Sequence, residues 1–100
     1  MNKVPNECAS LQDIRAEIDR IDREVIAAFG QRFAFVKAAA KFKTSEAGVK
    51  ASDRFAAMLQ QRREWAVAEG LNPDVIERLY RDLVTHFIEE ELKQWKQEAN

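Results

Sequence analysis

The sequence contains one cysteine, one histidine, two prolines and three glycines among its 100 residues. The single cysteine, Cys8, cannot close a disulfide within the chain, and one His beside one Cys provides no cluster with metal-ligand spacing. The N-terminal segment lacks the apolar run of a secretory signal, and nowhere does the run of about eighteen apolar residues occur that a spanning helix requires. We therefore expect a reduced, cytoplasmic protein without a metal site or a membrane span.

The chain also has no large excess of charge of one sign, because it contains 16 basic and 17 acidic residues and its net charge is -1. Such a chain has no overall basic field to hold a polyanion, so nucleic-acid binding is not expected. What is present is a composition that is 46% hydrophobic and 33% charged, dominated by Ala, Glu, Lys, Arg and Leu. This composition favours one folded, helical domain covering residues 1–100.

Three helices are predicted from the apolar spacing and the start and stop signals. The first runs from about 11 to 43 behind Ser10, which with Asp13 forms a capping-box-like start. A second begins at Ser52 and stops near Gly70. The third begins at Pro73 and runs to about residue 96, and residues 44–51 are left as a loop. The predicted fold is all-α with a very long first helix.

That first helix is too long for its own chain to bury its apolar stripe. It would be about 50 Å long at about 1.5 Å per residue, whereas the second helix is roughly half that length. Surplus apolar stripe is normally buried by a partner, and two-fold dimers are the commonest solution. We expect a homodimer in which the long helices lie against one another. The stripe consists of Leu11, Ile14, Ile18, Ile21, Val25, Phe29, Phe33 and Val36.

Several cations fall on this apolar stripe when each residue is placed about 100° further around the helix. Arg32 and Lys43 lie on the arc and Arg15 lies at its edge, while Lys37 and Lys41 fall on the solvent side. A buried cation is unfavourable unless an anion meets it. Arg32 and Lys43 therefore either reach the rim and pair with acids of the third helix, or they line a site for an anion.

The third helix favours a site, because Glu91 falls in the middle of its apolar arc whereas Glu89 and Glu90 fall outside. One inward acid facing several inward cations is typical of a polar pocket in a helical bundle. Arg54, at the start of the second helix, can add a further guanidinium. Without a Ser/His/Asp group or another nucleophile, such a pocket suits an anionic substrate, most simply a dicarboxylate held by Arg side chains.

The order of these cations resembles the all-α chorismate mutase (type II) family over nearly the whole chain. Within that family, the sequence is most similar to the isochorismate pyruvate lyases of salicylate and siderophore biosynthesis. FKTSEA (42–47) and REWAVAEGL (63–71) are the more specific motifs. The stretches that carry the resemblance are DIRAEIDRID (13–22), VKAAAKFKTSEA (36–47), DRFAAML (53–59) and RREWAVAEGL (62–71).

The resemblance implies an intertwined homodimer with two equivalent sites and a pericyclic reaction that needs no cofactor. Arg15 would come from the partner's long helix and grip one carboxylate of the substrate, and Arg32 would hold a second. Lys43 would stabilise negative charge on the ether oxygen as the C–O bond breaks. Arg54 would assist at the ring end, and the loop 44–51 would close over the ligand.

Two departures from the family pattern bear on which reaction is catalysed. Mutases carry Asp-x-x-Arg-Glu at the start of the second helix, where residues 51–55 here read ASDRF, and an apolar Phe55 favours the lyase with weak mutase side activity. A chorismate mutase proper and a non-catalytic dimerisation module remain the alternatives. The second departure is Glu91, where the bacterial enzymes usually carry Gln. Burial raises a carboxyl pKa and Lys43 would lower it, so the sign stays open. We hypothesise that activity requires protonated Glu91.

Overall fold

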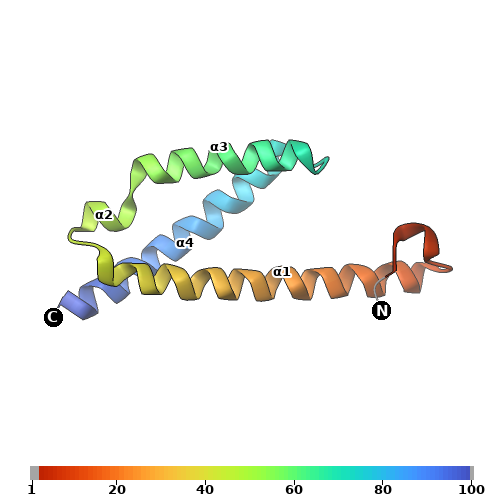
Figure 1. Cartoon of the computed structure of the whole chain (residues 1–100), viewed down its shortest axis with the longest axis horizontal. Helices are drawn as coiled ribbons and strands as arrows, with labels where there is room; N and C mark the ends of the chain where they lie inside the picture. The colour runs from red at the N-terminus through yellow and green to blue at the C-terminus, as the bar shows by residue number, and fades with distance from the viewer. Residues whose placement is uncertain (1–2, 100) are drawn as a thin grey trace. The chain divides into compact units, whose positions relative to one another are not determined.

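The structure is a computed structural model that describes residues 3–99, and no strand occurs in that range. This confirms the all-α prediction with three long helices, the first of them longest. None of the described helices combines the length and the apolar composition that a bilayer crossing requires. The elements, of which Figure 1 labels the four α-helices, are the 3-10 turn η1 (Pro5–Glu7), α1 (Leu11–Ala39), the 3-10 turn η2 (Ala40–Phe42), α2 (Glu46–Lys50), α3 (Ser52–Ala68) and α4 (Pro73–Ala99).

The chain divides into two compact units, Met1–Ala34 and Phe35–Asn100, and each is described by itself. In the first unit, the predicted start of α1 is confirmed. The Ser10 hydroxyl accepts a hydrogen bond from the Asp13 amide at 3.1 Å, and the Asp13 carboxylate accepts one from the Ala9 amide at 2.9 Å. That second bond, followed by the contact with Lys3, holds the pKa of Asp13 below its ordinary value. These bonds satisfy backbone donors that a helix start leaves unpaired.

The end of the first helix differs in detail from the prediction. Regular α-helix ends at Ala39, and the last turn tightens to the 3-10 form, closed by the Lys43 amide donating to the Ala40 carbonyl at 3.1 Å. Such tightening is a common way to satisfy the carbonyls of a helix end. Lys43 itself is the residue at which the chain leaves the helix, with φ -90° and ψ 140°.

The prediction of a plain loop over 44–51 was wrong, because this segment contains the short helix α2. Ser45 caps it, with its hydroxyl accepting from the Gly48 amide at 3.0 Å, and Glu46 follows in the first turn. Ser45 is a residue type that commonly caps helices, so the sequence does contain the signal for this helix start. Ala51 then separates α2 from α3 with φ 43° and ψ 58°, a left-handed conformation that is unfavourable for a residue with a Cβ.

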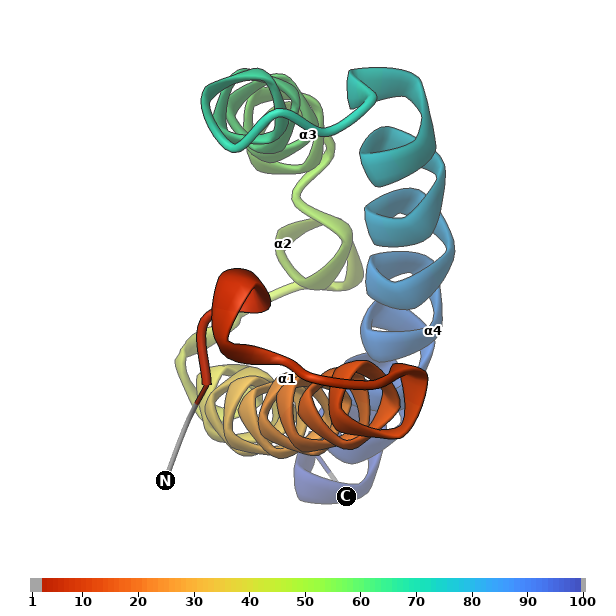
Figure 2. The same ribbon diagram turned by 90° about the vertical axis from the view of Figure 1, so that its right-hand side faces the viewer.

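The core of the second unit lies between α3 and α4, which form a helical hairpin (Figure 1). The turn between them uses Gly70 in the left-handed region, with φ 75°, and the Asn72 side chain caps α4 by accepting from the Asp74 amide at 2.8 Å. Helix α4 also packs against α2 and η2 (Figure 2). The core consists of Met58, Leu59 and Val84, covered by Phe55, Tyr80 and Ile88.

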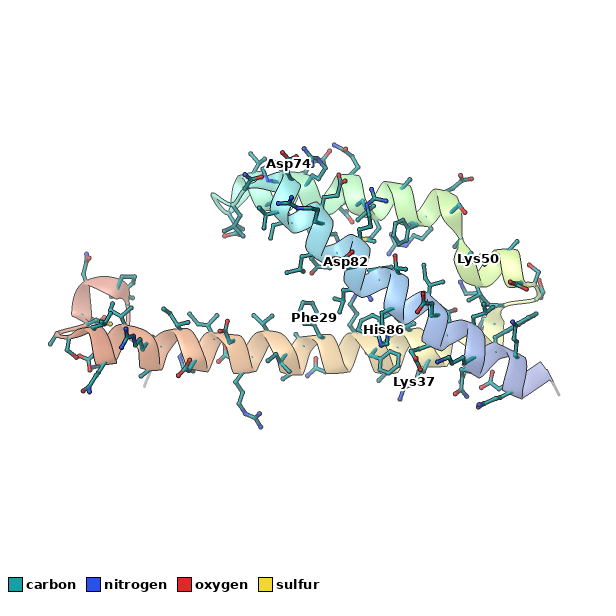
Figure 3. All side chains as sticks on the ribbon, turned by 180° about the vertical axis from the view of Figure 1, so that it is seen from behind. Phe29, Lys37, Lys50, Asp74, Asp82 and His86 are labelled. Carbon is teal, nitrogen blue, oxygen red and sulfur yellow. The ribbon has the colours of Figure 1, made fainter. Side chains whose placement is uncertain are left out.

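The predicted starts of α3 at Ser52 and α4 at Pro73 are confirmed. The last helix extends a few residues past its predicted end, to Ala99. Figure 3 labels Lys50 at the end of α2 and Asp74 in the first turn of α4.

Candidate functional site

Glu91 is an ionisable residue in an otherwise apolar stripe of α4. The buried residues of this helix recur at three- and four-residue spacing, from Val84 through Phe87 to Glu91, which places them on one face. Glu91 is 6% exposed, whereas Glu89 is exposed and Glu90 is half-buried. The predicted inward position of Glu91 alone among its acidic neighbours is therefore confirmed.

Lys43 brings its ammonium to this carboxyl group. Its Nζ lies 3.9 Å from Glu91 Oε2 and donates a hydrogen bond to the carbonyl oxygen of Gly48 at 3.2 Å. Lys43 is half-buried, while Lys37 and Lys41 are exposed, as the helical wheel predicted. The junction of η2 and α2 thus supplies the cation, and the middle of α4 supplies the acid.

The pKa of Glu91 is set by two opposing effects whose balance the sequence left open. Burial raises the pKa of the Glu91 carboxyl above its ordinary value, and the nearby Lys43 ammonium lowers it by less. The ion pair is long, and Oε2 accepts no hydrogen bond from any described residue. Without hydrogen bonds to stabilise the carboxylate, desolvation dominates.

A lysine ammonium beside a carboxyl group with a raised pKa provides two hydrogen-bond donors whenever that carboxyl group is protonated. Donors fixed in a shielded place stabilise an oxygen atom on which negative charge develops during a reaction. Neither group is an activated nucleophile here. The arrangement therefore suits a reaction that breaks a bond to an oxygen atom and requires charge stabilisation rather than covalent catalysis.

Within the second unit, the structure brings together the predicted site residues Lys43 and Glu91. Arg54 is exposed in the first turn of α3 and makes no ion pair with any described residue. Arg15 and Arg32 belong to the first unit, where Arg15 is exposed and Arg32 is half-buried with its Nη1 atom shielded from solvent. The roles expected for these three arginines stay predictions.

Two partners of Lys43 were not identified from the sequence. One is the Gly48 carbonyl oxygen, and the other is the Trp95 indole, whose Nε1 donates to the Lys43 carbonyl oxygen at 2.9 Å. A signal for the second existed, because Trp95 follows Glu91 by one helical turn and so lies on the same face. The sequence pattern placed Trp95 on an apolar arc but could not show which backbone it would meet.

Comparisons with known proteins give one matching family and similar proteins from two bacteria. The sequence profile of the family described as chorismate mutase type II matches residues 14–92. The chain is 44% identical over 95 residues to a Pseudomonas aeruginosa protein named isochorismate pyruvate lyase. The aligned residues cover 95% of this chain and 94% of that protein. It is also 40% identical over 73 residues to the T-protein of Haemophilus influenzae, covering 72% of this chain but 19% of that much longer protein.

Proposed function

Because the chain belongs to the chorismate mutase type II family, we propose that it is a lyase that eliminates pyruvate from isochorismate and leaves salicylate. The observation that carries the proposal is the 44% identity to an isochorismate pyruvate lyase over nearly the full length of both chains. The side reaction expected is weak mutase activity on chorismate. A cytoplasmic location, which the single cysteine favours, belongs to the same proposal.

In the proposed reaction, the ether C–O bond of isochorismate breaks while a ring hydrogen passes to the methylene carbon of the departing enolpyruvyl group. The products, pyruvate and salicylate, together contain all the atoms of the substrate, so no cofactor is required. Lys43 and protonated Glu91 would donate hydrogen bonds to the ether oxygen as it acquires negative charge. Their separation of 3.9 Å fits two donors that converge on one oxygen atom.

The arginines are proposed to hold the two carboxylates of the substrate and to fix its reactive pose. Arg32 would bind one carboxylate, Arg15 from the partner subunit the other, and Arg54 would contact the ring end. Guanidinium groups suit this task because they pair with carboxylates through two parallel hydrogen bonds. Fixing a flexible dianion in a reactive geometry can contribute several kcal/mol to the rate enhancement, on the order of 7 kcal/mol in favourable cases.

The proposed active unit is a homodimer in which residues 1–100 of each chain form one domain. Its support is apolar surface that a single chain leaves exposed on α1, where Leu11, Ile18 and Val25 recur every seven residues and are 60%, 49% and 43% exposed. Residues at this spacing lie along one face, as in paired helices.

The second candidate function is that of a chorismate mutase, converting chorismate to prephenate. The description of the matching family favours it, whereas the 44% identity to an isochorismate pyruvate lyase over 95% of this chain favours the lyase. The two candidates are separated by the ratio of kcat/KM on isochorismate to kcat/KM on chorismate.

The test is to incubate the purified protein with isochorismate and to follow salicylate by its fluorescence, with chorismate and a prephenate assay in parallel. We expect rapid formation of salicylate and little prephenate. Prephenate without salicylate would make the mutase the correct assignment. If neither product forms between pH 5 and pH 8, the inward cations specify the pairing of a non-catalytic dimer.

A further inference from the structure

Trp95 contacts the backbone of the residue whose side chain forms the candidate site. Its indole Nε1 donates to the Lys43 carbonyl oxygen at 2.9 Å, while the Lys43 amide donates to the Ala40 carbonyl oxygen at 3.1 Å. Both backbone polar groups of Lys43 are therefore fixed. The side chain of the same residue then reaches Gly48 and Glu91.

This fixation matters because of where Lys43 stands in the chain. It has left the 3-10 turn η2 in an extended conformation, and the next helix begins only at Glu46. Regular helical hydrogen bonding thus does not hold its carbonyl group. The ammonium lies at the end of a flexible four-carbon side chain, so a small rotation of the Lys43 backbone moves the ammonium by a large amount.

Trp95 and Glu91 are also neighbours on α4, one helical turn apart on the same face. One helix therefore provides both the carboxyl group that faces the ammonium and the donor that holds the backbone behind it. An indole N–H that is partly buried needs such an acceptor, and here the acceptor is a carbonyl from the junction of η2 and α2.

We propose that Trp95 is a positioning residue for the lyase reaction, which fixes the backbone of Lys43 so that its ammonium is held beside Glu91. This inference rests on the proposed function, in which Lys43 acts on the ether oxygen. Trp95 does not touch the reacting atoms; it acts through Lys43. Its indole N–H, rather than the bulk of its ring, carries this role.

The first test is Trp95→Phe, which keeps an aromatic ring but removes the N–H donor. We expect kcat for salicylate formation to fall by about tenfold or more, because small misplacements of a catalytic group are costly. KM should change little, since the arginines that bind the carboxylates are untouched. Trp65→Phe is the matched control, with the same chemical change at an exposed residue near the far end of α3, and its kcat should match the wild type.

A second readout reports the position of Lys43 without relying on catalysis. Lysines are acylated with a limiting amount of an N-hydroxysuccinimide ester, and the modification of each is quantified by mass spectrometry. In Trp95→Phe the ammonium of Lys43 should move away from Gly48 and Glu91. Its acylation rate should then rise severalfold relative to that of Lys50, an exposed lysine on α2 that serves as the reference (Figure 3). Trp65→Phe should leave that ratio unchanged.

An unchanged kcat in Trp95→Phe overturns the proposal. So does a lower kcat with all lysines reacting faster together, because that result indicates general loosening rather than positioning. If Trp95→Phe is unfolded by circular dichroism, the benzothienylalanine analogue, which replaces the indole N–H by sulfur at the same ring size, takes its place. If the wild type forms no salicylate, the proposed function fails, and the lysine ratio alone decides whether Trp95 positions Lys43.

Discussion

Replacement of Glu91 by glutamine is the change that tests the proposed chemistry most directly. The Glu91 carboxyl donates a hydrogen bond only while it is protonated, and burial raises its pKa above the ordinary value of 4.5. A glutamine amide donates at every pH. We therefore expect kcat/KM of the wild type to decline on the alkaline side of the raised pKa, and kcat/KM of Glu91→Gln to be flat from pH 5 to pH 8.

The size of the effect follows from the fraction of protonated carboxyl. Above its folded-state pKa, that fraction falls about tenfold for each pH unit, so kcat/KM of the wild type should fall by the same factor. Since the bound substrate adds two carboxylates, the profile of kcat should lie further toward alkaline pH than that of kcat/KM. At pH 8 the Gln variant should be more active than the wild type.

Stability should show the same titration with a defined sign. The folded protein holds the Glu91 proton more tightly than the unfolded chain does, so folding is favoured at low pH. The wild type therefore loses stability as the pH rises from about 4.5 to the raised folded-state pKa, by about 1.4 kcal/mol for each unit of elevation. The Gln variant lacks this loss.

The assay is salicylate fluorescence across pH 5 to 8 for both proteins, together with urea unfolding at about pH 4 and at pH 8 at one fixed protein concentration. The fixed concentration is needed because a dimer unfolds in a concentration-dependent way. The reasoning is refuted if the wild-type profile is as flat as that of Glu91→Gln, or if the free energies of unfolding of the two proteins change with pH in parallel.

Three further changes test other parts of the structure. Lys43→Ala should lower kcat for salicylate formation by about 100-fold or more, as for loss of one donor to a developing oxyanion, while circular dichroism stays that of the wild type; near-normal activity would remove Lys43 from the mechanism. Ile18→Glu places a charge on the exposed stripe of α1 and should convert the proposed dimer to monomers in sedimentation velocity; if the variant still sediments as a dimer, the interface lies elsewhere. Asn72→Ala removes the side-chain cap of α4, with its bonds of 2.8 and 3.4 Å to the amides of Asp74 and Val75, and should lower the free energy of unfolding by about 1 kcal/mol; Asn72→Asp, which retains an acceptor, is the control.

Local features were determined by the sequence. The helix starts at Ser10 and Asn72 depend on side chains that bond to amides two or three residues away, so neighbouring residues suffice to predict them. The inward position of Glu91 follows in the same way, because the helical period places it with Val84 and Phe87. The expectation that inward cations without a nucleophile favour an anionic substrate stays a prediction.

The short helix α2 was not predicted, because its five residues are too few to show a helical period. Its N-cap, Ser45, is a local signal for it. The residue-by-residue resemblance to the chorismate mutase family identified the candidate site residues, but only contacts can show which of them meet. The contacts of Arg15, Arg32 and Arg54 with the substrate depend on the proposed dimer and stay predictions.

Tertiary structure alone decided the approach of Lys43 to Glu91 and of Trp95 to the Lys43 carbonyl. Both contacts join residues far apart in the chain, and their geometry depends on how α4 packs against η2 and α2. The same packing decided the sign of the Glu91 pKa shift. Burial and a nearby cation act in opposite directions, and only the degree of burial and the 3.9 Å separation determine which is larger.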